Sequence, residues 1–113
     1  MKISKFCIYL ADLTPRFGTE PGKVRPVVVV QTDLLNDTHL STIICPITSQ
    51  MTKESKILRI HLSKTESGLE KDSDVLVDQV RAIDNRRFIK EIGQLTERNK
   101  KELLKNLRLI ILE

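Results

Sequence analysis

The sequence contains no tryptophan, and only one tyrosine and three phenylalanines among 113 residues. Because aromatic side chains make up 4% of the chain, a hydrophobic core has to be filled by valine, isoleucine and leucine. Hydrophobic residues account for 40% of the sequence, which excludes wholesale disorder. A chain of this length has the usual size of one domain. We therefore expect a single domain over residues 1–113 with an aliphatic core.

Cysteine and histidine are scarce and scattered. The sequence contains two cysteines and two histidines, and the two cysteines do not have the spacing of a zinc-binding or redox pair. Cys7 and Cys45 both lie in apolar runs, so we expect buried free thiols, with a disulfide as the less favoured alternative. The aspartates are scattered as well, and no motif gathers them. The sequence therefore predicts neither a metal nor a cofactor.

Long apolar segments are also missing. The first apolar run ends at Asp12, which makes it too short for a membrane span or a signal peptide. We therefore expect a cytoplasmic protein that does not enter a membrane. Lysine and arginine outnumber aspartate and glutamate by 19 to 15, and the resulting net charge of +4 favours a polyanionic partner. In a two-fold symmetric dimer this charge would add up over one surface.

Short apolar runs rich in β-branched residues predict a mainly β fold, because turn-forming residues separate them. The expected strands are residues 6–13, 26–31, 42–49, 57–62, 74–80 and 89–95, with a turn signal in residues 81–88. Pro46 predicts that its strand is an edge strand or contains a bulge, since proline donates no ladder hydrogen bond. Arg59 and His61 alternate with apolar residues and should face away from the core.

A helix is predicted in the C-terminal part of the sequence. Thr96 can cap its N-terminus, and Glu97 lies in its first turn. Apolar residues then recur with helical spacing in one stripe, which should pack on the sheet or at a subunit contact. The stripe consists of Leu103, Leu104, Leu107, Ile110 and Ile111. The predicted fold class is therefore mainly β with a C-terminal helix, arranged as a small barrel or an open sandwich.

Arg25 and Pro26 stand directly before four consecutive valines. Proline biases the preceding residue toward extended backbone, and the valines predict a buried strand. The guanidinium of Arg25 should therefore be held at the rim of the core, where it can bind an anion. Thr48 and Ser49 end another apolar strand. Their hydroxyls either belong to a site or mark the place where the strand turns into solvent.

The loop before Arg25 is basic, contains glycine and carries Phe17 beside Arg16. Such a loop can stack a nucleic acid base next to a phosphate track, but it can equally be an ordinary surface connection. Phe17 is therefore a candidate stacking platform or a packing residue of the loop. Arg16 and Arg81 either contact phosphates or belong to a solvated face.

Motifs for other kinds of catalysis are absent, including GxSxG, SxxK and the Walker and Rossmann phosphate loops. The remaining candidates for catalytic groups are the cations and hydroxyls at the ends of the predicted strands. They suit cleavage of RNA by its own 2′-hydroxyl, because the substrate carries the nucleophile and the protein has to align it and stabilise charge. An arginine fork can bind two phosphate oxygens, and a threonine hydroxyl can orient one of them. Since arginine stays protonated near neutral pH, Arg25 fits an electrostatic clamp better than a general base.

Five blocks of the sequence resemble the MazF/PemK family of toxin endoribonucleases, in the family's order and spacing. The blocks are Ala11-Asp12-Leu13-Thr14-Pro15, Gly18-Thr19-Glu20, Arg25-Pro26-Val27-Val28-Val29, Pro46-Ile47-Thr48-Ser49-Gln50, and Asp72-Ser73 followed by Asp78-Gln79-Val80-Arg81-Ala82-Ile83-Asp84. Together they span nearly the whole chain.

The resemblance implies an SH3-like or CcdB-like β-barrel with a C-terminal helix. It also implies the toxin of a type II toxin–antitoxin system, a homodimer that cuts single-stranded mRNA at specific sequences without a metal and so inhibits translation and growth. A cognate antitoxin is the implied protein partner. The family's essential arginine and threonine fall on Arg25 and Thr48, the predicted catalytic residues. The candidates for RNA binding are Thr19, Gln79, Ser49, Phe17, Arg81 and Arg16.

Two other functions fit the same fold. CcdB-like toxins resemble this family in structure but bind and poison DNA gyrase without cutting nucleic acid. They depend on a C-terminal tryptophan and glycine, whereas this sequence has no tryptophan and ends in Ile110-Ile111-Leu112-Glu113. The second of these functions is that of a non-catalytic RNA-binding barrel or an inactive toxin, and the presence of both Arg25 and Thr48 argues against it.

Overall fold

A computed structural model describes residues 1–15, 18–19, 23–51 and 57–113 of the chain. Seven strands occur in these residues: β1 (Cys7–Asp12), β2 (Val24–Val29), β3 (Ser41–Thr48), β4 (Arg59–Leu62), β5 (Ser73–Leu76), β6 (Arg81–Asp84) and β7 (Phe88–Gln94). The helices are α1 (Lys64–Ser67) and α2 (Glu97–Leu107), with 3₁₀ turns at Val77–Gln79 and Asn85–Arg87 and a π-helical turn at Arg108–Leu112. The predicted fold class, mainly β with a C-terminal helix, is confirmed.

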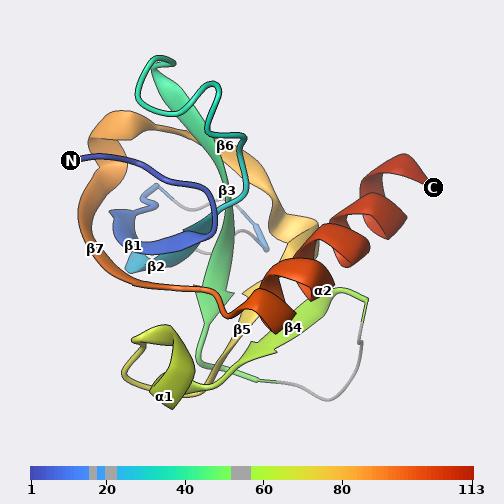
Figure 1. The fold of residues 1–113 in the computed structure, drawn as a ribbon. Helices are drawn as coiled ribbons and strands as arrows, with labels where there is room; N and C mark the ends of the chain where they lie inside the picture. Colours follow the sequence, from blue (N-terminus) through green and yellow to red (C-terminus); the bar gives the residue numbers. More distant parts are fainter. Residues whose placement is uncertain (16–17, 20–22, 52–56) are drawn as a thin grey trace.

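The strands form one curved antiparallel sheet. Neighbouring strands follow the order β4-β5-β3-β2-β1-β7, and β6 pairs with β3. Figure 1 shows the sheet curling so that β1, β2 and β7 wrap around one side, while α2 lies beside β4 and β5. In the described residues β4 and β7 end the hydrogen-bonded path, so the barrel is open rather than closed. This open form remains compatible with an SH3-like barrel.

β3 is the central strand, and the expectation that Pro46 marks an edge or a bulge is wrong. On one side β3 pairs with β2, where Pro46 lies opposite Val27. On the other side β3 pairs with β6 from Ser41 to Ile44, and with β5 at Ile47 and Thr48. Pro46 therefore lies where the second partner strand changes, between the two ladders. A central strand can hold a proline there because neither ladder on that side requires its missing N–H.

The segment after β4 differs in detail from the sequence-based prediction. The predicted strand over residues 74–80 ends at Leu76, and a 3₁₀ turn at Val77–Gln79 follows it. Val77 is fully buried in that turn, so its apolar side chain serves core packing rather than strand pairing. Residues 81–84, where the sequence showed a turn signal, form β6 against β3.

The core is aliphatic, as the scarcity of aromatic residues predicts. Val28 belongs to one buried cluster, whereas Val27 and Val29 belong to a second cluster on the opposite face of β2. Because both faces of β2 are covered, its sequence is a continuous valine run rather than an alternation of apolar and polar residues. Tyr9 is the aromatic exception in the core. Its hydroxyl accepts a hydrogen bond from Ser4 N at 2.8 Å and donates one to Lys2 O at 3.1 Å.

Helix α2 begins as predicted, with Thr96 Oγ1 accepting a hydrogen bond from Asn99 N at 3.1 Å. Its apolar stripe is divided between the core and the surface. Leu103 is fully buried, and Leu107 and Ile110 pack partly against the same cluster. Leu104 and Ile111 are exposed instead. None of the helices in the described residues has the length and apolar character needed to cross a membrane.

Candidate active site

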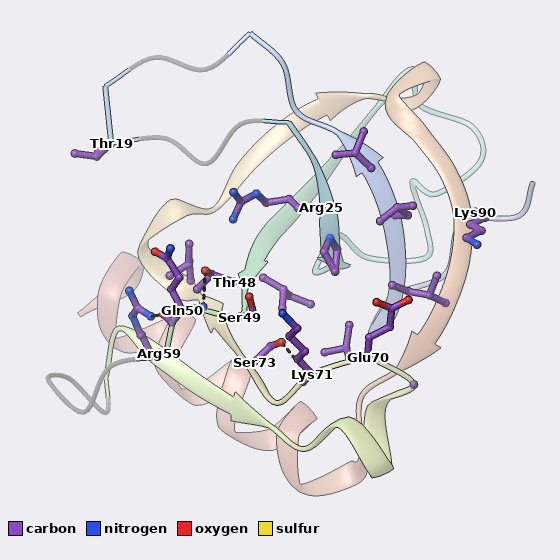
Figure 2. Close-up of a pocket in the computed structure, with 18 residues that line it drawn as sticks. Thr19, Arg25, Thr48, Ser49, Gln50, Arg59, Glu70, Lys71, Ser73 and Lys90 are labelled. Carbon is purple, nitrogen blue, oxygen red and sulfur yellow. Dashed lines mark hydrogen bonds between the residues drawn. The ribbon is translucent and has the colours of Figure 1, made fainter.

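An open cleft of about 780 Å³ lies where the ends of several strands meet. Its walls come from β2, the end of β3, the start of β4, the segment around residues 68–73 and β7. Among the described residues that line it, the cations are Arg25, Arg59, Lys71 and Lys90, and the carboxylate is that of Glu70. Figure 2 shows Arg25, Thr48, Ser49 and Gln50 on one side of this cleft. The excess of cations favours an anionic ligand.

Arg25 is held by the strand that the sequence predicted. It pairs with Ala11 of β1, and the valines that follow Pro26 are buried. Just before β2, Lys23 O accepts a hydrogen bond from Leu13 N at 2.8 Å, which extends the contact between the two strands to the rim. The backbone at Arg25 is therefore fixed, while its half-buried side chain reaches into the cleft. A guanidinium on a rigid strand suits the binding of phosphate oxygens.

Thr48 is the last residue of β3, and a turn begins directly after it. Its Oγ1 accepts a hydrogen bond from Gln50 N at 3.1 Å. A threonine hydroxyl that accepts from an N–H still has its own proton to donate. Because Thr48 also lines the cleft, that proton can be donated to a ligand oxygen. The strand end thus supplies a hydrogen-bond donor beside the Arg25 guanidinium (Figure 2).

Arg59 is a lining residue that the sequence did not single out for the site. It begins β4, and its Nη1 donates a hydrogen bond to Gln50 O at 2.8 Å. The same nitrogen lies 3.4 Å from Asp74 Oδ2. The alternation of β4 placed Arg59 on the face away from the core, which is correct. No local pattern could show that this face borders the cleft, since β4 reaches β3 only through β5, a strand that comes later in the sequence.

The predicted RNA-binding residues fall into three groups. Thr19 and Ser49 line the cleft, and Figure 2 shows Thr19 at its outer margin, apart from the residues at the end of β3. Gln79 and Arg81 are half-buried and lie outside the set of residues that line the cleft. Arg16 and Phe17 lie outside the described residues.

Neither thiol of this protein has the properties of a nucleophile. Both cysteines are free, as predicted. Burial raises the pKa of the Cys45 thiol to about 12, and burial also raises the pKa of Cys7. Both thiols therefore stay protonated at neutral pH. Among the residues that the structure describes, no three histidine, cysteine, aspartate or glutamate side chains gather into a group that could hold a metal ion.

The protein is a small curved antiparallel sheet, and an arginine and a threonine at neighbouring strand ends border its basic cleft. Together the sheet and the cleft define a β protein suited to an anionic ligand. The sequence matches the family described as PemK-like, MazF-like toxins of type II toxin–antitoxin systems over residues 4–111. The chain belongs to this family.

Two similar proteins have names that describe an activity. The chain is 34% identical over 96 residues to "Endoribonuclease MazF" of Staphylococcus saprophyticus, an alignment that covers 85% of this chain and 80% of that protein. It is 35% identical over 97 residues to "Endoribonuclease EndoA" of Bacillus subtilis, covering 86% and 84% of the two chains. Both relatives are therefore similar over most of their length.

Solved structures share the fold at lower identity. The crystal structure of MazF from Deinococcus radiodurans matches with a TM-score of 0.83 and 22% identity, covering 98% of this chain and 97% of that one. A MazE–MazF structure from the same organism matches with a TM-score of 0.79 and 18% identity, covering 99% and 97%. The alternative function of a CcdB-like gyrase poison finds no support in these relatives, which are named as MazF proteins or endoribonucleases.

Proposed function

We propose that this toxin is a sequence-specific endoribonuclease that cuts single-stranded mRNA in the cleft, with Arg25 and Thr48 as its catalytic residues. One observation carries the proposal: a guanidinium on β2 and a hydroxyl at the end of β3 border the same basic cleft (Figure 2). The names of the two relatives support the reaction class. Residues 1–113 act as a single toxin domain in this proposal.

The reaction proceeds by attack of the ribose 2′-oxygen on the adjacent phosphorus. The new bond joins the 2′-oxygen to phosphorus, and the bond from phosphorus to the 5′-oxygen of the next nucleotide breaks. The 2′-hydroxyl loses its proton, and the leaving 5′-oxygen gains one. The products are a 2′,3′-cyclic phosphate and a 5′-hydroxyl, and no metal takes part.

Charge builds up on the phosphate oxygens during this step, so groups that bind those oxygens more strongly in the transition state accelerate it. Arg25 binds two of them through its guanidinium fork. The Thr48 hydroxyl, which accepts from Gln50 N, donates its own proton to one of them. Both groups act without changing protonation state near neutral pH.

The remaining predicted residues bind RNA away from the reacting phosphate. Ser49 and Thr19 lie along the cleft and contact the chain of nucleotides there. Gln79 and Arg81 contribute where the RNA continues past the cleft, and Arg16 and Phe17, which precede β2 in the sequence, contribute further contacts. These contacts give the sequence specificity, and Arg81 and Arg16 add to the salt dependence that the cations of the cleft produce.

The toxin acts as a homodimer in the cytoplasm, where a cognate antitoxin binds and inhibits it. The MazE–MazF structure of Deinococcus radiodurans supports a protein antitoxin for this fold. Large apolar side chains exposed in the segment before β3, including Leu34 and Leu40, and at the end of the C-terminal helix leave surface for protein contacts. Light scattering of the purified protein tests the dimer, and a monomer at micromolar concentration would overturn it.

Cleavage of a long single-stranded RNA in EDTA tests the proposed activity. The wild-type protein should cut at a small set of sequences and leave cyclic phosphate ends, whereas folded Arg25→Ala should not cut. Equal cleavage by the variant would remove Arg25 from the mechanism. Absence of cleavage by the folded wild-type dimer would overturn the activity itself, and a gyrase supercoiling assay would follow.

A further inference from the structure

A row of polar residues crosses three strands beside the cleft. Thr48 of β3 lies directly opposite Asp74 of β5, and Asp74 lies directly opposite His61 of β4. Residues that face each other in an antiparallel pair point their side chains to the same side of the sheet. Arg59 lies two residues before His61 in β4 and therefore shares that side as well. Strand pairing thus places Arg59, Asp74 and Thr48 on one face.

Asp74 is the buried member of this row, with a side-chain exposure of 5%. A buried carboxylate needs an opposite charge or hydrogen bonds to offset the cost of its desolvation. Arg59 supplies one such contact, with Nη1 at 3.4 Å from Oδ2. His61 Nδ1 lies 3.5 Å from Oδ1, but the histidine side chain is 60% exposed. The arginine, with 25% of its side chain exposed, is the better shielded of these two partners.

The arginine connects this carboxylate to the turn after Thr48. Arg59 Nη1 donates to Gln50 O at 2.8 Å, and Gln50 N donates to Thr48 Oγ1 at 3.1 Å. In Figure 2 the Arg59 side chain lies next to Gln50, and Thr48 lies on the inner side of the same turn. The Gln50 carbonyl and the Gln50 N–H belong to successive peptide units that meet at the Gln50 Cα. A contact to the carbonyl therefore restrains that Cα and limits the rotation of the N–H away from Thr48. Asp74, Arg59, Gln50 and Thr48 therefore form one chain of contacts.

We propose that Arg59, held by Asp74, is a positioning residue that fixes the Thr48 hydroxyl for catalysis. The Gln50 N–H selects the Thr48 rotamer in which Oγ1 accepts its hydrogen bond, so the hydroxyl proton points to the cleft. Without Arg59 the turn loses a restraint, and Thr48 populates other rotamers. This inference rests on the proposed function, because it assigns a role in that same reaction.

Kinetics with three variants separate positioning from RNA binding. Arg59→Met retains the apolar stem of the side chain but removes all its donors, Arg59→Lys retains the charge, and Arg98→Ala is the matched control. Arg98 is an exposed arginine of α2 whose carboxylate partners are Glu66 and Glu102. We expect Arg59→Met to lower kcat by roughly tenfold to a hundredfold, the cost of a misplaced catalytic group. Arg59→Lys should restore part of that loss, and Arg98→Ala should behave as wild type.

RNA affinity provides the readout that distinguishes positioning from a direct phosphate contact. The probe is an RNA oligonucleotide with a 2′-deoxy substitution at the mapped cut site, which binds but cannot be cleaved. Its Kd should change by no more than about twofold in Arg59→Met. A large loss of affinity, together with a decrease of about 0.7 in the slope of log Kd against log salt, would make Arg59 a phosphate-binding residue instead. An unchanged kcat in Arg59→Met would overturn the proposal as well.

The rotamer of Thr48 tests the inference without RNA. Three-bond couplings from Thr48 Cγ2 to its own backbone nitrogen and carbonyl carbon report χ1 in the labelled protein. Wild type and Arg98→Ala should show one rotamer, and Arg59→Met should show averaging. Arg59→Ala, which also removes every donor of the side chain, serves here if Arg59→Met does not fold. If the wild type cuts no RNA but the couplings change as expected, the proposed function fails while the positioning stands. A single unchanged rotamer in a folded Arg59→Met or Arg59→Ala protein overturns the positioning even if the wild type is active.

Discussion

Gly93 of β7 lies so close to Ser67 of α1 that a Cβ added to the glycine would be 1.8 Å from the Ser67 carbonyl oxygen. The same Cβ would lie 3.3 Å from the Cα of Gly68, a residue that lines the cleft. The contact therefore fixes the segment that forms one wall of the cleft against the edge strand. Two backbone segments can approach this closely only where one of them carries no side chain.

Replacement of Gly93 by alanine should destabilise the protein because the obstacle is a backbone oxygen, which cannot rotate away. We expect a loss in the free energy of unfolding of roughly 3 kcal/mol or more, at the upper end of the cost of overpacking. Urea denaturation measures this loss. Glu91→Ala in the same strand is the control, since its side chain is exposed, and it should change stability by less than about 0.5 kcal/mol. Equal stability of the two variants would contradict the close approach.

Thr48→Val should lower kcat more than RNA affinity. Valine has nearly the same shape as threonine, but it removes the hydroxyl that donates to the phosphate in the proposed reaction. We expect kcat to fall by roughly a hundredfold, the cost of removing one donor to a developing negative charge. Single-turnover cleavage and binding of the 2′-deoxy RNA separate the two effects.

Thr38→Val is the control, because Thr38 Oγ1 donates to Leu35 O at 3.0 Å in a segment outside the cleft. Parallel losses in kcat and affinity would make Thr48 a simple binding contact.

Leu103 and Leu104 are adjacent in α2 but differ in environment. Leu103 has no exposed surface, whereas Leu104 is 45% exposed. Leu103→Ala should cost about 2–5 kcal/mol of unfolding free energy because it opens a cavity in the core. Leu104→Ala should cost less than about 1 kcal/mol in the monomer. Thermal or urea unfolding of the pair tests which face of the helix packs on the sheet, and a larger loss for Leu104 would show that the helix is rotated.

Asp84 should titrate at unusually low pH. The Arg86 side chain donates to both carboxylate oxygens, at 2.9 and 3.0 Å, and Arg86 N donates to Oδ1 at 2.8 Å. These hydrogen bonds lower the pKa of Asp84 from 3.8 to about 2. Because the folded-state pKa is lower than the unfolded one, the stabilising contribution is present above pH 3.8 and is lost as the pH falls toward 2.

Carboxyl chemical shifts measured by NMR during an acid titration test this prediction. In Arg86→Ala the Asp84 titration should move toward ordinary values, but not completely, since the backbone N–H remains. Arg98→Ala should leave the Asp84 titration unchanged. A wild-type midpoint near that of a free aspartate would show that the contacts with Arg86 do not persist in solution.

The salt dependence of RNA binding should reflect the cations of the cleft. Neutralisation of Z phosphates on single-stranded RNA gives a slope of about −0.7Z in a plot of log affinity against log salt concentration. Arg25→Ala should therefore reduce the magnitude of the slope by about 0.7, measured by anisotropy with the 2′-deoxy RNA. A flat salt response of the wild type would contradict binding of a polyanion in this cleft.

The sequence alone determined the nature of the core and the places of most elements, because these depend on short-range patterns. The valines after Pro26 form a strand buried on both faces, and Thr96 caps the helix that the apolar spacing predicts. The candidate residues Arg25 and Thr48 were also apparent from local sequence, since Arg25 stands at the start of one apolar strand and Thr48 at the end of another. Their presence in one cleft follows from the direct pairing of β2 with β3.

Tertiary structure decided the features that depend on strands far apart in the sequence. Pro46 fits in the central strand only because β3 exchanges β6 for β5 near that residue. Arg59 has no local motif, and it reaches the turn after Thr48 because β5 lies between β4 and β3. Periodicity shows which face of a strand is buried, but the choice of neighbouring strand depends on long-range packing. The sequence therefore identified the residues at the strand ends, and the order of the strands determined which of them meet.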